Sequence, residues 1–328
     1  MKVLITGGLG MIGSCLAAAY LRDGHQVLVY DNEEIGAVSN LNYHLSSDEV
    51  ANVEVIRADV LERERLARAL EGVNLCFHMA ATLGTIRVVH EPRRMMRVNI
   101  TGTQNAIDLC VERKIPIVIA STSMVYGNNP APVVHEEDAL FVDGDLSRGL
   151  WWYAVSKLAD EAYARSTILE CPECKILTVR PFNVVAPLQK GMDGFVLPRF
   201  IRAAIEGEPL LVYGDGSQRR TFLWVTDFVD SLVRVVQSGH WNETVNIGST
   251  EEISILDLAQ LVVRMSGSSS PVKLIEPQTI FRNQFAEIGR RIPDLRRLHE
   301  LIGESRSTPI EEIVRRFLVN QPQLAREA

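Results

Sequence analysis

Short runs of apolar and β-branched residues alternate with longer stretches of helical periodicity through residues 1–180. Runs of the first kind predict β-strands, whereas apolar positions three or four residues apart predict amphipathic helices. We expect strands over residues 2–6, 26–30, 53–57, 75–78, 115–121 and 175–180, and helices over residues 11–23, 62–70, 92–113 and 153–170. Alternation of this kind is typical of a parallel sheet covered on both faces, so we predict a doubly wound α/β fold.

The pattern becomes less regular after residue 180. Turn-forming residues cluster at positions 191–194 and 213–217, and small residues at 266–271. We expect two further strands and two further helices, over residues 244–247, 272–275, 255–264 and 309–320. The pattern therefore predicts a principal domain over residues 1–180 and a smaller C-terminal lobe over residues 181–328, with segments within 220–265 returning to the principal domain.

The composition limits the function classes. Of the 328 residues 46% are hydrophobic, which is enough for a large buried core. The 41 acidic and 34 basic residues give a formal net charge of −7 and form no basic stripe of the kind that nucleic acid requires. No apolar run has the length of a membrane span, and residues 1–5 meet glycines too soon for a signal peptide. We therefore expect a soluble, cytoplasmic protein with no nucleic-acid or membrane partner.

The five cysteines are an odd number in a chain without a secretion signal, so we expect reduced thiols. Cys171 and Cys174 have the spacing of a zinc or redox pair, but no second pair accompanies them. A redox pair is favoured at the start of a helix, and no helix start follows these two cysteines. We interpret them as part of a solvent-side turn and expect no metal site.

A glycine-rich turn follows the first predicted strand and precedes the first helix. Gly7, Gly10 and Gly13 fit the needs of a dinucleotide pyrophosphate: a tight turn, close approach of the backbone, and close packing of helix on strand. Asp31 ends the second strand, where its carboxylate would accept hydrogen bonds from the adenosine ribose and repel a 2′-phosphate. The predicted cofactor is therefore NAD rather than NADP. Further cofactor contacts are expected from Met11, Ile12, Asn32, Asp59 and Val60. Asp59 could equally cap the helix over residues 62–70.

Tyr153 and Lys157 lie four positions apart on a predicted helix, so their side chains project from one face. A nearby ammonium stabilises a phenolate and lowers the tyrosine pKa, which would let Tyr153 act as a base on a substrate hydroxyl. The strand over residues 115–121 brings Ser121, Thr122 and Ser123 to the carboxyl edge of the sheet, where ligands of such folds bind. A hydroxyl there can share the substrate proton with Tyr153, although Ser121 and Ser123 could instead satisfy local backbone groups.

Several motifs together resemble the extended short-chain dehydrogenases/reductases that act on nucleotide sugars. The likeness is carried by residues 6–13, 78–81, 99, 121–127, 153–157 and 180–183. The resemblance implies that Thr122, Tyr153 and Lys157 form the catalytic triad, with Tyr153 and Lys157 also at the cofactor. It further implies that Ala80, Ala81 and Asn99 line the nicotinamide side.

The same resemblance implies a nucleotide-sugar substrate, with UDP as the preferred nucleotide, held by the C-terminal lobe. Asn183 and Arg220 would hold its diphosphate, for which an arginine fork is well suited. The other implied substrate contacts are Thr82, Ser123, Met124, Lys190, Val196, Arg199, Tyr213 and Arg291. Members of this family commonly dimerise through two helices, which here would be residues 92–113 and 153–170, so we expect a homodimer.

Some residues depart from the family pattern. Decarboxylases and 4,6-dehydratases of the family usually carry Glu two residues after the catalytic Thr, whereas Met124 stands there and cannot transfer a proton. The usual Gly-Pro after the diphosphate-binding Asn is Ala186-Pro187, Leu188 replaces an expected arginine, and Trp151-Trp152 precede Tyr153. We therefore expect an NAD-dependent 4-epimerase of a UDP-hexose or UDP-hexuronate that acts through a transient 4-keto intermediate.

Three alternatives remain open. The same ketone would permit decarboxylation of UDP-glucuronate, and the family also contains 4,6-dehydratases. A regulator that binds NAD without turnover is the third, but it would be expected to lack Tyr153 and Lys157. Lys190 lies in a loop where 4-epimerases of UDP-glucuronate are expected to place a cation for the sugar carboxylate, although a solvated loop lysine is the simpler interpretation.

Overall fold

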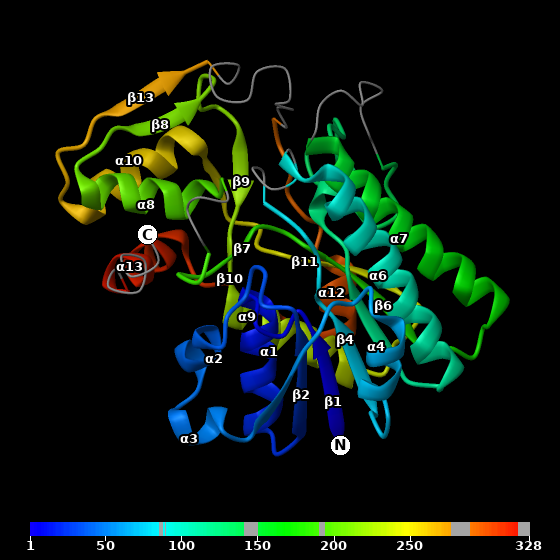
Figure 1. Ribbon diagram of the computed structural model, residues 1–328. Coiled ribbons are helices and arrows are strands. Elements are labelled where there is room, and N and C mark those ends of the chain that lie inside the picture. Colours follow the sequence, from blue (N-terminus) through cyan, green and yellow to red (C-terminus); the bar gives the residue numbers. More distant parts are fainter. Residues whose placement is uncertain (85–87, 89, 141–149, 190–193, 277–288, 321–328) are drawn as a thin grey trace.

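A seven-stranded parallel sheet forms the centre of the protein, in a computed structural model that describes residues 1–84, 88, 90–140, 150–189, 194–276 and 289–320. The strand order is β11-β6-β5-β4-β1-β2-β3 (Figure 1). The strands are β1 (Lys2–Thr6), β2 (Gln26–Asp31), β3 (Val53–Arg57), β4 (Leu75–His78), β5 (Ile117–Ala120), β6 (Ile176–Pro181) and β11 (Thr244–Ile247). This order reverses its direction between β1 and β4, so the predicted doubly wound fold is confirmed.

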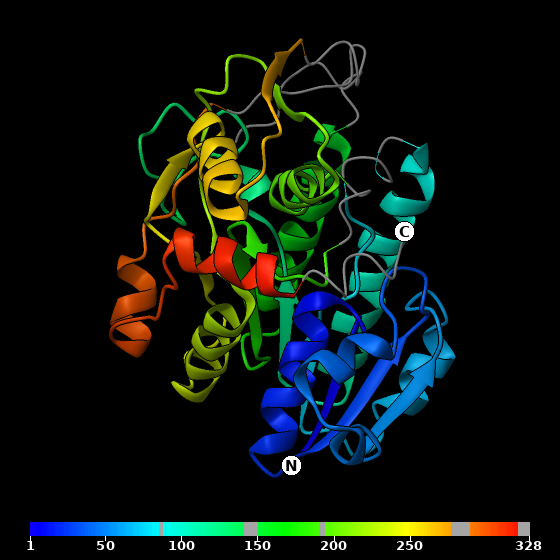
Figure 2. The same cartoon turned by 90° about the vertical axis from the view of Figure 1, so that its left-hand side faces the viewer.

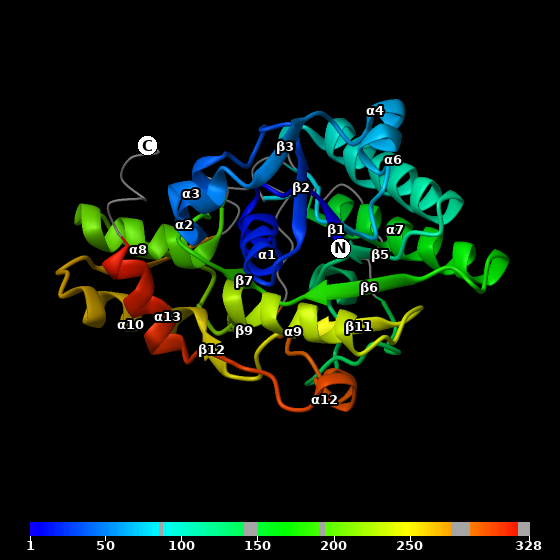
Figure 3. The same cartoon turned by 90° about the horizontal axis from the view of Figure 1, so that it is seen from below.

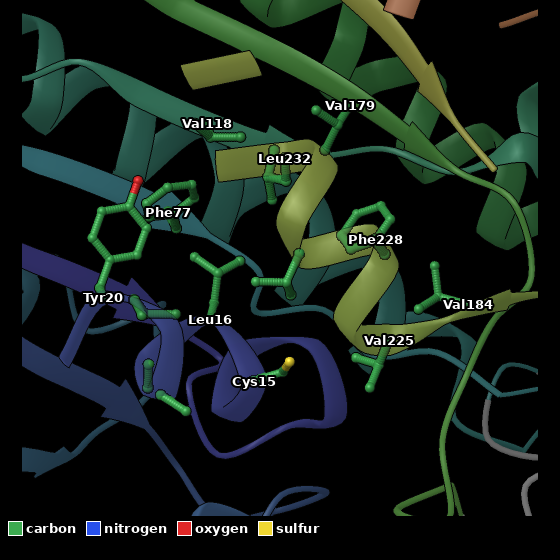
Figure 4. Packing of buried hydrophobic residues seen from close by; sticks show 14 of the residues in the cluster. Cys15, Leu16, Tyr20, Phe77, Val118, Val179, Val184, Val225, Phe228 and Leu232 are labelled. Carbon is green, nitrogen blue, oxygen red and sulfur yellow. The ribbon is translucent and has the colours of Figure 1, made fainter. Parts of the chain in front are cut away.

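Helices cover both faces of the sheet (Figure 3). One face carries α1 (Met11–Arg22) and α9 (Val225–Gln237), and the other carries α4 (Arg63–Ala69), α6 (Pro92–Glu112) and α7 (Leu150–Glu170). Alternate residues of each strand enter the two cores: Val3 packs on the α1 side and Leu4 on the α6 side. Figure 4 shows the first core, where Leu16 and Phe228 belong to the same buried cluster as Phe77. Strands buried on both faces read as continuous apolar runs, which is why the sequence predicted them well.

A third hydrophobic cluster lies outside the central sheet. It contains α8 (Val196–Glu206), α10 (Ile255–Ser266), α13 (Ile310–Val319) and the parallel pair β8 (Leu210–Tyr213) and β13 (Val272–Ile275). In Figure 2 the red helix α13 lies beside the yellow helix α10. Two short pairs lie between this cluster and the sheet (Figure 1): β7 (Val184–Val185) with β10 (Leu223–Trp224), and β9 (Arg219–Thr221) with β12 (Glu252–Ser254).

The chain passes between these parts more than once. After α8 and β8 it returns to the sheet through α9 and β11, leaves again to form α10, and comes back with α12 (Arg296–Ile302), which contacts α9 and β11. Because of these returns, residues from the second half of the chain face residues from the first half along the edge of the sheet.

The predicted elements agree with the observed ones to within three residues, the largest shift being the start of α7 at residue 150. The sequence interpretation missed α2 (Ser39–His44), α3 (Ser47–Val50), the 3₁₀ turn η1 (Ser123–Tyr126), α8, α9, α12 and the short strands β7, β8, β9, β10 and β12. The missed strands have two to four residues, a length over which the alternation signal is weak.

The predicted turns at residues 213–217 and 171–174 are present. Gly214 and Gly216 adopt positive φ after β8, and the Cys174 amide donates to the Cys171 carbonyl at 3.0 Å, with both thiols free. The turn predicted at residues 191–194 lies mostly outside the described residues. None of the helices in the described ranges combines the length and the apolar character needed to cross a membrane.

Two glycines of the turn after β1 have no room for a side chain. A Cβ on Gly7, whose φ is +66°, would lie 2.6 Å from the Ala80 amide nitrogen, and one on Gly13 would lie 2.2 Å from the Gly7 carbonyl oxygen. Both contacts are with backbone, which cannot rotate away. The two glycines therefore let β1, α1 and the end of β4 approach one another.

Gly13→Ala should lower the free energy of unfolding by about 1–3 kcal/mol because its methyl group overlaps this backbone. Urea denaturation would measure the change. Gly289→Ala is the matched control, since a Cβ there meets nothing within 4 Å and φ is not positive. Equal stability of the two variants would contradict the close approach at Gly13.

Candidate active site

A cavity of about 560 Å³ opens at the carboxyl edge of the central sheet, beside the third hydrophobic cluster. Its wall combines the turn after β1 with the ends of β2, β4 and β5, and with residues of α7, α8 and β9. Of the described residues predicted to be catalytic, cofactor-binding or substrate-binding, all but Asn99 line it. Groups from residue 7 to residue 291 therefore share one cavity, while their individual ligand contacts stay predictions.

The turn after β1 has the form of a pyrophosphate site. Gly10 is the N-cap residue of α1, and no side chain caps this helix. Backbone amides of an uncapped first turn are available to an anion, and Gly10, Met11, Ile12 and Gly13 line the cavity at this point. The residues present therefore fit the diphosphate of NAD.

Asp31 is fixed at the end of β2 with its carboxylate against the cavity. Its Oδ2 accepts a hydrogen bond from the Leu9 amide at 3.0 Å, and its Oδ1 accepts one from the Glu33 amide at 2.8 Å. Burial raises the pKa of this carboxyl group, and the two backbone hydrogen bonds oppose that shift. The position agrees with the predicted contact to the adenosine ribose.

Asp59 lines the cavity and also organises its own turn. It accepts hydrogen bonds from the Asn32 side chain at 3.1 Å and from the Leu61 amide at 2.9 Å. The N-cap residue of α4 is Glu62, so the alternative that Asp59 caps this helix is wrong.

Asn99 lies behind the cavity wall and is fully buried. Its Oδ1 accepts from the Thr82 amide at 2.8 Å, and its Nδ2 donates to the Thr82 carbonyl at 3.2 Å and to Ser156 Oγ at 3.0 Å. Asn99 therefore ties the segment after β4, which carries Ala80 and Ala81, to helix α7. In this arrangement it supports the lining residues without lining the cavity itself.

The tyrosine, lysine and threonine singled out from the sequence come together. Tyr153 forms a hydrogen bond with Thr122, and the Lys157 ammonium lies close enough to act on the phenol. Burial raises the pKa of Tyr153 overall, and the Lys157 charge and the Thr122 hydrogen bond only oppose this rise, so the expected lowering of the tyrosine pKa is not seen. Thr122 is held in turn as the N-cap of η1, where its hydroxyl accepts from the Met124 amide at 3.2 Å. These contacts suit Tyr153 to proton transfer with a substrate hydroxyl.

Ser121 and Ser123 take different places. Ser123 lines the cavity, whereas Ser121 donates to the Glu161 carboxylate below it. Glu161 also receives two hydrogen bonds from Arg180, at 2.9 and 2.7 Å. Arg180 donates further to the Tyr126 hydroxyl at 2.7 Å, so β5, η1, α7 and β6 are joined beneath the catalytic residues.

Three arginines bring positive charge to the cavity. Arg199 stacks on the Tyr213 ring with its guanidinium carbon 4.2 Å from the centroid, and Arg220 extends from β9. Arg291 is 7% exposed, and its Nη1 lies 2.8 Å from the Met124 sulfur. Its Nε has no hydrogen-bond partner among the described residues. Burial and the charge of Arg220 lower the pKa of Arg291, so an anion at this point would be bound favourably.

Two further residues were predicted to bind the substrate, and the structure describes one of them, Asn183. Asn183 has a positive φ of 38° and donates from Nδ2 to the Thr221 carbonyl at 2.7 Å, which directs its own backbone toward β9 and β10. Lys190 lies outside the described residues, so its proposed contact with a sugar carboxylate stays a prediction.

Sequence reasoning did not single out several contributors. Asn40 of α2 donates to the Leu9 carbonyl at 2.7 Å and so supports the glycine turn from 31 residues away. Asp160 pairs with Lys157 at 3.0 Å. The i, i+3 spacing of Lys157 and Asp160 could have revealed their ion pair. No local signal in the sequence marks the contact between Asn40 and Leu9.

The profile of the NAD-dependent epimerase/dehydratase family matches residues 3–248. A UDP-N-acetyl-α-D-glucosaminuronate decarboxylase of Bacillus cytotoxicus is 34% identical over 301 residues, which cover 92% of this chain and 91% of that protein. The family profile extends over the glycine turn and the residues around Tyr153 and Lys157.

Two solved structures show the same architecture over nearly the whole chain. The UDP-glucuronic acid 4-epimerase of Bacillus cereus, in complex with UDP-glucuronic acid and NAD, has 26% identity and a TM-score of 0.86, covering 99% of this chain and 100% of that one. A UDP-N-acetylglucosamine 4-epimerase of Methanobrevibacter ruminantium has 25% identity and a TM-score of 0.86, with coverage of 100% and 99%. These similarities extend to enzymes of different reaction type.

Arg180→Met should lower the free energy of unfolding by about 3–5 kcal/mol because it leaves the Glu161 carboxylate buried without its cation. Urea denaturation would report the loss. The exposed pair of Arg202 with Glu206 offers the control Arg202→Met, for which we expect a change below about 1 kcal/mol. A similar effect of both substitutions would refute a structural role of the buried pair.

Proposed function

The chain belongs to the NAD-dependent epimerase/dehydratase family, and on that premise we propose that it is a 4-epimerase of a UDP-hexuronate. One observation carries the choice of reaction and sugar: the buried guanidinium of Arg291 reaches the cavity beside Tyr153 and contacts Met124. Decarboxylases and 4,6-dehydratases of the family usually carry Glu at the position of Met124. The glycine turn and Asp31 would hold NAD, and the bound cofactor would supply the redox chemistry by which a hydroxyl at C4 of the sugar becomes a ketone and is restored.

The protein carries the proton transfers. Tyr153 takes the proton of the C4 hydroxyl as the ketone forms and gives it back as the hydroxyl is restored. The Lys157 ammonium stabilises the phenolate between these steps, and the Thr122 hydroxyl shares the proton. Positioned acid–base groups of this kind contribute about 10²–10⁴-fold to a rate.

Arg291 suits the carboxylate of a uronic acid. A carboxylate beside it would replace the poor Met124 sulfur contact with a charge-assisted hydrogen bond. Loss of carbon dioxide requires the negative charge to move from the carboxylate into the sugar ring, and a cation on the carboxylate opposes that movement. Met124 has no proton to give to the ring carbon that would be left behind. Both residues therefore favour retention of the carboxylate and turnover by epimerisation.

Decarboxylation through the same ketone is the second candidate, and the similarity to the Bacillus cytotoxicus decarboxylase favours it. Tyr153, Lys157 and Thr122 would serve both reactions. A 4,6-dehydration needs further acid–base chemistry that Met124 does not provide. The assembled contacts of Tyr153 speak against a regulator without turnover.

Incubation with UDP-glucuronate and NAD should give an isomer of unchanged mass, because epimerisation neither adds nor removes atoms. Separation by retention time and mass would identify it. Release of carbon dioxide would show that the protein is a decarboxylase and overturn the proposal. If no UDP-sugar is converted, both the epimerase and the decarboxylase candidates are rejected. UDP-glucose in the same assay tests whether the carboxylate is needed.

In that assay Arg291→Met should lower kcat/KM for UDP-glucuronate by about 10–150-fold, equivalent to losing a hydrogen bond between charged partners, with little effect on UDP-glucose. Arg290→Met is the matched control, because Arg290 pairs with Glu252 away from the cavity. Equal losses for both sugars would assign Arg291 to the diphosphate that they share.

We further propose that the protein is a homodimer in which α6 and α7 form the contact. These helices lie side by side in Figure 1, and the surface beside them has a hollow lined by Pro92, Arg93, Met96, Arg97, Ile100, Thr101 and Trp152. A partner's side chains could fill this hollow. Sedimentation should give a dimer at micromolar concentration, and Ile100→Glu should give monomers. Ile205→Glu, at an exposed position of α8, should leave the dimer intact, whereas a monomeric parent protein would overturn the proposal.

A further inference from the structure

A buried carboxylate stands directly behind the proposed catalytic lysine. Asp160 Oδ2 lies 3.0 Å from Lys157 Nζ, and each side chain is only 2% exposed. Both residues belong to α7, three positions apart, so the pair is formed within one helix. Lys157 lines the cavity and Asp160 does not, which places the carboxylate on the protein side of the ammonium.

This pair decides whether Lys157 can stay charged. Burial removes water from the ammonium and favours the neutral amine. The pKa of a fully buried lysine can therefore lie about 3–5 units below that of a lysine in water. For Lys157 burial is the largest influence and lowers the pKa, but the charge and hydrogen bond of Asp160 oppose it and the pKa is raised overall. Without Asp160, burial would dominate.

The other charged groups around Lys157 do not replace this carboxylate. Tyr153 and Glu161 face it from α7, and His78 faces it from β4. Glu161 is matched by Arg180 at 2.7 Å, so most of its charge is already compensated. Burial and the nearby Lys157 lower the pKa of His78 to about 3, so this imidazole is neutral at the pH values of interest.

A chain of uncharged groups runs from the end of β4 to Thr103 of α6, on the side of Asp160. The Ala80 amide donates to Thr6 Oγ1 at 3.3 Å, and Thr6 Oγ1 lies 2.8 Å from His78 Nδ1. His78 Nε2 lies 3.2 Å from Thr103 Oγ1. Burial raises the pKa of Asp160, whereas the Lys157 charge and the Thr103 hydroxyl oppose the rise. Asp160 Oδ1 is buried without a hydrogen-bond partner among the described residues, so this carboxylate depends on the Lys157 ammonium for its compensation.

We propose that Asp160 is a positioning residue, the internal counter-ion that keeps the Lys157 ammonium charged and in place beneath Tyr153. The role in turnover rests on the proposed function, whereas the ion pair itself does not. Asp160 touches neither the reacting atoms nor the cavity and acts only through Lys157.

The first test measures the charge of Lys157 without any substrate. Acetic anhydride acetylates only the unprotonated amine, and mass spectrometry of the digested protein gives the rate at Lys157 as a function of pH. We expect the amine of Asp160→Asn to become reactive at a pH at least about 2 units below that of the parent protein, because burial is then unopposed. Asp108→Asn removes a carboxylate from the neighbouring helix α6 and should leave the profile unchanged. Identical profiles for Asp160→Asn and the parent would overturn the proposal.

The second test uses whichever UDP-sugar is turned over. A lysine without its counter-ion loses its charge as the pH rises, and the phenolate of Tyr153 then loses its support. The alkaline limb of kcat/KM for Asp160→Asn should therefore move to lower pH, while activity at the acid end stays within about tenfold of the parent. A uniform loss at all pH values would indicate a merely structural role and reject the proposal. A shift in acetylation without turnover of any sugar would refute the proposed function alone.

If Asp160→Asn does not fold, the double variant Lys157→Met with Asp160→Asn keeps the inference testable. Lys157→Met alone leaves the carboxylate buried without its cation, and the double variant removes both charges. We expect the double variant to have the higher urea midpoint of the two. A midpoint equal to or below that of Lys157→Met would contradict an ion pair at this position.

Discussion

The buried ion pair between Arg180 and Glu161 is the interaction on which the geometry of the cavity depends. It joins β6 to α7, and its hydrogen bonds extend to Ser121 at the end of β5 and to Tyr126 in η1. Tyr126 donates in turn to Asn246 of β11 at 2.8 Å. An arginine and a carboxylate buried together tolerate no loss of either partner, so this contact fixes the relative positions of four strands and helices.

The same hydrogen-bond network reaches the backbone next to Arg291. The Asn246 side chain donates to the Val134 carbonyl at 3.1 Å, and the Val134 amide donates to the Ile292 carbonyl at 2.8 Å. Arg291 precedes Ile292, so its backbone is anchored to the sheet by a short series of hydrogen bonds. A residue 138 positions after Tyr153 is thereby held beside it, without belonging to a neighbouring element of the chain.

Two adjacent carboxylates of helix α7 take part in two different ion pairs. Asp160 and Glu161 are adjacent in sequence but point about 100° apart, so one carboxylate serves Lys157 and the other serves Arg180. The first pair bears on proton transfer and the second on the framework. Arg199, Arg220 and Arg291 also line the cavity and bring positive charge to it.

The sequence by itself determined the central sheet, the glycine turn and the Tyr153–Lys157 helix, because each depends on local spacing: buried strands are continuous apolar runs, and four residues make one helical turn. The strands after β6 have only two to four residues, and of these the sequence predicted β11 and β13 but missed β7, β8, β9, β10 and β12. Only the tertiary structure decided that Arg291 meets Met124, that Asn99 stands behind the wall, and that Asp59 does not cap α4. These outcomes depend on contacts between residues far apart in the chain, whose distances follow from the packing of whole elements and leave no periodic trace in the order of the amino acids.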